Sequence, residues 1–264
     1  MTFEITHKIS TIVNDNAKEI QTSFNVEFLA LEKKSNFNTY EISKTKVINT
    51  PSHKNSYLTF LENLEQLTYP IKIQTTSQGE FVKLIEYREW LERWEENTAI
   101  LMEEYDGNEN AKDILEKFNI NVYDEQIFMQ NKFKEPFWNL IFFNPKIEDD
   151  EQSNNITINW NLKSIGNVEC TGKTKFVKSD TGESLLCFES QDVINEGCTE
   201  IINFITSNKA NQNEYMTKVK AITALDTSHS RVKYKSAIFE IQKDTSFHYK
   251  EEIFLNIRRE INSK

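Results

Sequence analysis

The stretch that decides the fold is Thr2–Phe28, TFEITHKISTIVNDNAKEIQTSFNVEF, in which apolar and polar residues alternate on both sides of a short polar interruption. Alternation with a period of two is typical of a half-buried β-strand. The interruption, Asn14–Asn16, has the residue types of a turn. The stretch therefore predicts a long antiparallel hairpin that turns one face toward a core.

The residues that follow extend this sheet and add a first helix. Tyr40–Val47 alternates again and predicts, with the hairpin, a three-stranded antiparallel meander. Ile71–Thr75 and Phe81–Ile85, separated by a Ser-Gln-Gly-Glu turn, predict a tight hairpin. Between these strands, Ser56–Leu67 carries apolar residues at helical spacing, so a short amphipathic helix is expected there.

From Tyr87 onward the period changes to that of an amphipathic helix. The apolar face of this helix consists of large side chains, namely Tyr87, Trp90, Leu91, Trp94 and Leu101. Asp106-Gly107-Asn108 ends it, and Ala111–Phe118 and Asp124–Phe143 are expected to form further helices. Pro136 removes a backbone donor inside the last of them and should kink or split it.

Residues 145–155, with the sequence PKIEDDEQSNN, are polar and acidic and predict a linker. Strands resume after it, around a helix at 198–207, and are expected at 156–162, 168–177, 184–189, 215–225, 232–242 and 247–258. The predicted fold class is α+β, with long antiparallel β-strands curved over central helices in two similar strand-rich halves. We expect a strand meander plus an acidic helical segment at residues 1–146. A strand-rich antiparallel half at residues 154–264 either stands alone or packs with the first as one domain.

The composition is that of a packed globular protein with an excess of acids. The 264 residues include 31 Lys and Arg against 41 Asp and Glu, and 38% are hydrophobic. No apolar run reaches the roughly 18 residues needed to span a bilayer. Three cysteines without Cys-x-x-Cys spacing are typical of reduced thiols. These features favour a cytoplasmic location, and the abundance of Asn, Ile and Lys favours a bacterial source.

The sequence contains none of the common catalytic or cofactor motifs. Cys170–Thr174 copies the end of a phosphate-binding loop, but Asn167 stands where that loop needs glycine. The four histidines are scattered, and His7 lies on the apolar face of the first strand, where a hydrogen-bonded histidine is expected rather than a base or metal ligand. We therefore expect no cofactor and no metal, and catalysis is disfavoured.

The acidic residues are concentrated in one segment, since residues 80–125 hold 14 acids against 5 bases. Four acids recur at helical intervals opposite the tryptophans, namely Glu89, Glu92, Glu96 and Glu103. These four form the predicted partner-binding surface, and its partner should carry a basic surface.

That partner is either another protein or a second copy of the chain. A second copy could supply lysines that recur at intervals of two and predict exposed strand faces, namely Lys218, Lys220, Lys233 and Lys235. Nucleic acid is not an expected partner, because the chain is acidic overall and has no recognition motif.

A group of aromatic residues is the second candidate site. Trp90, Trp94, Trp138 and Phe137 could line a pocket for an apolar small molecule, although core packing explains the same pattern. The layout of long antiparallel strands around helices is similar to the half-barrel cradles of bacterial lipoprotein carriers, which implies lipid binding.

Three hypotheses follow from these observations. The first is a non-catalytic cytoplasmic interaction protein, an adaptor or component of a larger bacterial assembly, that docks through the acidic helical surface. The second is an apolar-ligand or lipid-binding half-barrel cradle. The third is a hydrolase without a recognisable signature.

Overall fold

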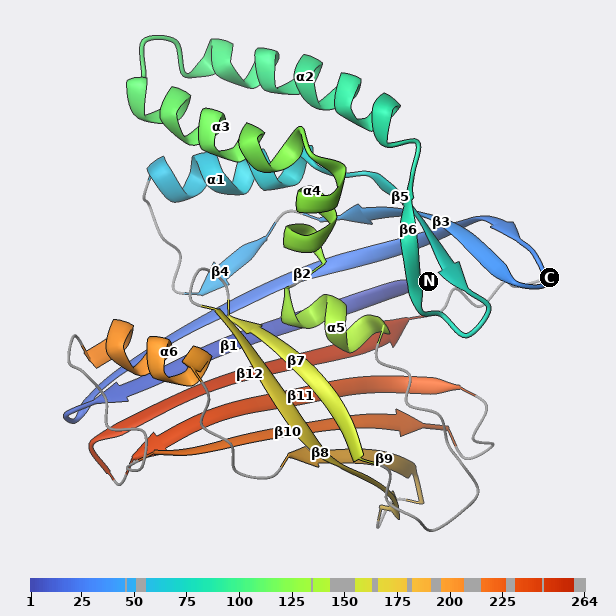
Figure 1. Cartoon of the computed structure of the whole chain (residues 1–264), viewed down its shortest axis with the longest axis vertical. Coiled ribbons are helices and arrows are strands. Elements are labelled where there is room, and N and C mark those ends of the chain that lie inside the picture. Colours follow the sequence, from blue (N-terminus) through green and yellow to red (C-terminus); the bar gives the residue numbers. More distant parts are fainter. Residues whose placement is uncertain are drawn as a thin grey trace. The chain divides into compact units, whose positions relative to one another are not determined.

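The computed structural model describes residues 1–45, 47–50, 56–133, 135–142, 155–162, 166–179, 182–190, 196–206, 215–226, 231–243 and 245–258. Within these residues, twelve strands form one antiparallel sheet, and six helices accompany it (Figure 1). This confirms an antiparallel sheet with helices, compatible with the α+β class. None of the described helices is both long and apolar enough to cross a bilayer.

The strands are β1 (Thr2–Val13), β2 (Asn16–Lys33), β3 (Phe37–Lys44), β4 (Ile48–Thr50), β5 (Ile71–Thr76), β6 (Phe81–Ile85), β7 (Asn155–Leu162), β8 (Gly166–Lys178), β9 (Ser184–Ser190), β10 (Met216–Leu225), β11 (Val232–Lys243) and β12 (Phe247–Arg258). Their order in the sheet is β6-β5-β3-β2-β1-β12-β11-β10-β9-β8-β7, and β4 pairs with β2. The helices are α1 (Ser56–Leu67), α2 (Tyr87–Glu104), α3 (Glu109–Val122), α4 (Glu125–Lys132), α5 (Pro136–Phe142) and α6 (Glu196–Thr206).

Local sequence signals explain most of these boundaries. Asn14 and Asp15 adopt positive φ angles of 47° and 66°, which is the geometry of a tight hairpin turn between β1 and β2. Pro136 begins α5, and the expected long helix is split there into α4 and α5 because proline has no N–H to donate within a helix. The short strand β4 was not predicted, since three residues are too few to show a period.

The chain divides into two compact units that do not follow the order of the sequence. Unit 1 contains residues 1–3, 24–133 and 259–264, and unit 2 contains residues 4–23 and 134–258. The predicted linker lies outside the described residues except for Asn155, which begins β7. The division into residues 1–146 and 154–264, and the likeness of the two halves, stay predictions.

Each unit buries the apolar face that its sequence pattern predicts. In unit 1, Val26 of β2, Ile42 of β3 and Ile73 of β5 are completely buried, and α1, α2 and α3 pack against one another (Figure 1). In unit 2, Ala221 of β10 lies opposite Ala237 of β11, and α5 packs against β7, β11 and β12. Burial of these apolar faces is the main force that stabilises each unit.

The segment that resembled a phosphate-binding loop lies inside strand β8. A Cβ atom on Gly172 would lie 2.3 Å from the backbone oxygen of Glu189 on β9, so glycine is needed there for the close approach of two strands. Its neighbour Thr171 shares a hydroxyl contact of 3.1 Å with Thr157 of β7. The residues around this glycine therefore have a structural role in the sheet.

The cysteines are free thiols that the fold shields from reagents. Cys170 and Cys198 are buried, and burial raises the pKa of Cys170 to about 12. Cys187 is half-buried, and its pKa is also raised by burial. Because the thiolate is the reactive form, we expect iodoacetamide at neutral pH to label Cys187 first, and Cys170 and Cys198 only as the chain unfolds. Mass spectrometry of timed samples measures the order, and rapid labelling of Cys170 in the folded protein would contradict it.

Candidate functional site

Helix α2 carries the four acids that the sequence assigns to a partner-binding surface, and that surface stays a prediction. The buried side of this helix is formed by Trp90, Trp94, Thr98 and Leu101, which recur at three- and four-residue intervals. The predicted residues Glu89, Glu92, Glu96 and Glu103 are all exposed on the remaining surface. Glu92 makes a loose ion pair with Arg88, with 3.7 Å between Nε and Oε1. The exposed apolar side chain of Ile100 lies on the same helix.

A hollow of about 370 Å³ lies at the C-terminal end of α2 and is lined by Ala99, Met102, Glu103 and Asp106. The chain turns just beyond the helix, where Gly107, three residues after the last residue of α2, adopts a positive φ of 75°, a conformation that glycine favours. Two carboxylates and two apolar side chains therefore face one small space. A lysine or arginine side chain fits this chemistry, because its methylene stem can cover Ala99 and Met102 while its charged end meets Glu103 and Asp106.

A second, larger hollow follows one face of α3 and has a volume of about 510 Å³. Its lining residues are Leu61 of α1 and Asn110, Asp113, Ile114, Lys117, Phe118 and Asn121 of α3. The α3 residues recur at intervals of three and four, so they share one side of the helix. Asn108 caps the start of α3 by accepting a hydrogen bond from the backbone N–H of Ala111 at 3.2 Å.

Trp90 and Trp94, two of the predicted pocket residues, are packed between α2, α3 and α4. Trp94 is 0% exposed, stacks on Phe118 at 5.3 Å between ring centroids, and donates from Nε1 to Asn119 Oδ1 at 3.0 Å. Trp90 lies 4.4 Å from the ring of Phe128 and donates to the Thr68 carbonyl. Trp94 thus supports Phe118, which lines the α3 hollow, and neither tryptophan is among the lining residues of the two hollows described above.

Trp138 and Phe137, the other two predicted pocket residues, lie on α5 in unit 2. Trp138 is 0% exposed and Phe137 is 2% exposed. The Trp138 ring stacks on Phe142 at 5.6 Å and lies 4.9 Å from the ring of Phe137. The four predicted residues therefore belong to two units, two to each, and an apolar ligand at them stays a prediction.

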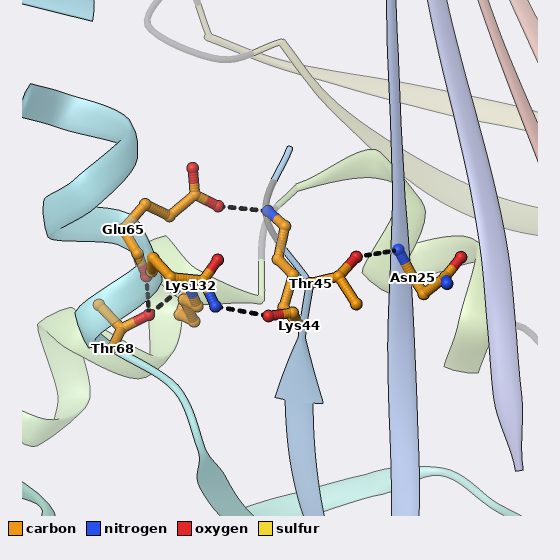
Figure 2. Close-up of polar contacts among 7 residues, drawn as sticks. Asn25, Lys44, Thr45, Glu65, Thr68 and Lys132 are labelled. Carbon is orange, nitrogen blue, oxygen red and sulfur yellow. Dashed lines mark hydrogen bonds and ion pairs between the residues drawn. The ribbon is translucent and has the colours of Figure 1, made fainter. Parts of the chain in front are cut away.

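Buried polar contacts hold the helices of unit 1 in place. Figure 2 shows Lys44, the last residue of β3, reaching Glu65 of α1, with 2.5 Å between Nζ and Oε1. The Lys44 side chain is only 4% exposed, and its Nζ lies 4.3 Å from the centre of the Phe24 ring. Thr45 accepts a hydrogen bond from the backbone N–H of Asn25 at 2.8 Å. These contacts fix α1 to the strands.

A second buried lysine joins α4 to the end of α1. Lys132 donates to the Thr68 hydroxyl at 2.9 Å (Figure 2), and its Nζ lies 4.2 Å from the centre of the Tyr69 ring. The cation stands near the C-terminal end of α1, where the helix dipole favours positive charge. The contacts of Lys44 and Lys132 therefore join α1 to β3 and to α4 within unit 1.

Of the four lysines that a second copy was predicted to supply, three are partly exposed and paired with acids, and one is buried. Lys218 and Lys220 both lie 3.1 Å from Glu189, and Lys233 lies 2.8 Å from Glu183. Lys235 was predicted to be exposed, and that prediction is wrong, because the residue is only 3% exposed. The alternation of β11 places it on the buried face with Ala237 and Phe239. The flexible lysine stem tolerates this position.

The buried carboxylate of Glu251 organises a polar cluster in unit 2. Its Oε1 lies 2.6 Å from Nε2 of His7, and its Oε2 accepts hydrogen bonds from Trp160 Nε1 at 2.9 Å and Tyr249 OH at 3.4 Å. Burial and the negative charge of Glu251 raise the pKa of Tyr249. The expectation that His7 is hydrogen-bonded is confirmed. Sequence reasoning missed Glu251, although it alternates with Tyr249 and Ile253 on the buried face of β12.

The described residues contain no group of three or more acidic, histidine or cysteine side chains that could hold a metal ion. No protein family matches the sequence, and no curated protein matches it either. A solved structure described as lipid–protein interactions in lipovitellin is similar to 98% of this chain, with a TM-score of 0.47 and 12% identity. The match covers 25% of that protein, so this chain spans about a quarter of its length.

Proposed function

We propose that the chain is a protein-interaction module whose unit 1 binds a basic partner through the exposed acidic face of α2. The observation that carries this proposal is the hollow in which Glu103 and Asp106 face Ala99 and Met102. It combines negative charge with apolar surface in the form that a long basic side chain needs. Glu89, Glu92 and Glu96 extend the negative charge along the same helix.

The partner is proposed to be a different protein rather than a second copy. The lysines that a second copy would supply are held by Glu189 and Glu183 or, for Lys235, buried. A basic amphipathic segment of another protein could place its cations against α2 and its apolar side chains near Ile100 and Met102.

The test uses a fluorescently labelled synthetic helix of leucine and lysine, with a second helix in which glutamate replaces lysine. We expect the lysine helix to bind at micromolar concentration in fluorescence anisotropy, and more weakly as salt rises above about 0.15 M, where the Debye length is roughly 8 Å. The glutamate helix should not bind. Binding of the lysine helix that does not change with salt would contradict electrostatic docking.

Charge reversal identifies the surface used. We expect the triple variant Glu92→Lys, Glu96→Lys and Glu103→Lys to lower affinity for the lysine helix at least about tenfold, equivalent to roughly 1.4 kcal/mol. Its stability should change little, because exposed helix charges contribute a few tenths of a kcal/mol each. The matched control reverses three exposed acids outside α2, Glu27, Glu32 and Glu80. Equal losses in the two triple variants would show that net charge, not the α2 surface, determines binding.

A further inference from the structure

The larger hollow of unit 1 follows one side of α3 over about 17 Å, since its first and last lining residues on that helix are eleven positions apart. On its far side it is bounded by Leu61 of α1. The lining residues of α3 form successive layers along the helix, namely Asn110, then Asp113 with Ile114, then Lys117 with Phe118, then Asn121. We call this side of α3 the layered face.

The layered face has the same order of residue types from either end. An asparagine stands at each end, and each inner layer combines one charged residue with one apolar residue. The two charges are opposite in sign. A second α3 that lies antiparallel to the first would therefore place Asp113 against Lys117 of the second copy, and Lys117 against its Asp113. Such reciprocal contacts are what a two-fold symmetric interface requires.

The two rows of side chains on the layered face also match under two-fold symmetry. Asp113 and Lys117 are four residues apart, as are Ile114 and Phe118, so each pair forms a row along the helix. When a two-fold axis relates two antiparallel helices, each row faces the same row of the other helix in the reverse direction. The charged row would then meet the charged row, and the apolar row would meet the apolar row. Ile114 and Phe118 are half-buried, so both keep apolar surface that a second copy can cover.

The charged side chains of the layered face are available to another molecule. Asp113 and Lys117 are exposed, and within the described part of the chain neither side chain makes a hydrogen bond or an ion pair. The surface around them is already ordered, because Phe118 stacks on Trp94 and Asn121 accepts a hydrogen bond from Asn131 at 3.1 Å. A surface that is ordered before association loses less conformational entropy when it binds.

The charge balance of the layered face favours a second copy over a basic partner. Residues 80–125 hold 14 acids against 5 bases, so two copies of this segment repel each other at most approaches. The layered face contains one acid and one base and has no net charge. Two copies can therefore meet there without local repulsion. A strongly basic helix would meet Lys117 at this face, and it is expected at α2 instead.

We propose that the layered face of α3 is a two-fold contact between two copies of this chain, in which Asp113 of each copy pairs with Lys117 of the other. This contact is separate from the α2 surface that is proposed to bind a basic partner, and the dimer would present two such surfaces. A contact of this length is small for a protein interface, so we expect a weak dimer with a dissociation constant of about 0.1 mM.

Sedimentation velocity of the full chain at about 5–500 µM tests the proposal through two charge variants. Asp113→Lys and Lys117→Asp each place like charges opposite each other in a homodimer, so either variant alone should associate at least tenfold more weakly than the unmodified chain. An equimolar mixture restores both opposite-charge pairs and should form a heterodimer about as strong as the original dimer. Mixing cannot repair a defect in folding, so recovery identifies the pairing itself. Circular dichroism checks that each variant is helical.

The matched control pair makes the same charge changes elsewhere on α3. Glu116→Lys and Lys112→Asp alter exposed residues that do not line the hollow, and both variants should associate like the unmodified chain, alone and mixed. A chain that stays monomeric up to about 500 µM would overturn the proposal. So would a dimer that neither Asp113→Lys nor Lys117→Asp weakens, or a mixture of these two variants that stays monomeric.

Discussion

Replacing Trp94 with alanine is expected to destabilise the protein by about 3–5 kcal/mol, the range for removing a large buried aromatic side chain. Trp94 is 0% exposed, and its ring stacks on Phe118 and lies 6.1 Å from that of Trp90. The variant would leave a cavity between α2 and α3. It would also remove the indole N–H that donates a hydrogen bond to Asn119 Oδ1. Urea unfolding followed by circular dichroism measures the change in the free energy of unfolding.

The conservative variant Trp94→Phe separates packing from hydrogen bonding. It retains an aromatic ring against Phe118 and loses the indole N–H, so we expect a smaller loss than for alanine. If Trp94→Ala costs less than about 1 kcal/mol, Trp94 does not belong to a packed core. Displacement of an environment-sensitive apolar dye from the native protein by fatty acid, lost in Trp94→Ala, would then support the pocket hypothesis at this residue.

Replacing Glu251 with alanine is expected to cost about 3–5 kcal/mol, because removing one partner of a buried charged cluster leaves the others without compensation. The carboxylate is contacted by His7, Trp160 and Tyr249, and the residue is 3% exposed. In the variant, the indole and phenol donors would stay buried without their acceptor, which is unfavourable for each of them. The unfolding free energy in urea measures the loss.

Two further variants test the cause of that loss. Glu251→Gln keeps the size of the side chain and one carbonyl acceptor, so it should cost less than Glu251→Ala. Glu252 is the next residue and lies on the other face of β12, where it forms an ion pair with Lys250; both side chains are about one-third exposed or less. The substitution Glu252→Ala removes this ion pair and should lower the free energy of unfolding by about 1 kcal/mol or less. Similar losses for Glu251→Ala and Glu252→Ala would show that the buried cluster contributes nothing specific.

The strands and helices could be predicted because the spacing of apolar residues within each segment shows the period of a strand or of a helix. The hairpin turn at Asn14 and Asp15, the helix Ser56–Leu67 and the split at Pro136 all arise from contacts or restrictions within a few residues. The exposure of Glu89, Glu92, Glu96 and Glu103 was predicted for the same reason, since a helix that buries Trp90 and Trp94 must turn its opposite side outward.

The candidate sites could be predicted only in part. Glu103 was identified from its helical interval, but its hollow also needs the turn at Gly107 and the position of Asp106. Lys235 was assigned to an exposed face because lysine is usually exposed, and the periodicity of β11 was given too little weight against that tendency. The pattern that places Lys235 with Ala237 and Phe239 was present in the sequence.

By itself, the sequence determined which segments are strands, which are helices and which glutamates of α2 are exposed, because these properties depend on neighbours within about one turn or one hairpin. Only the tertiary structure decided the contacts between distant residues. His7 and Glu251 are 244 positions apart, and Lys235 and Leu140 are 95 positions apart. The register between strands β9, β10 and β11 places Ser184, Thr223 and Lys235 on one buried face. Such pairings depend on the register between strands that are far apart in the chain. The spacing of apolar residues within one strand does not determine that register.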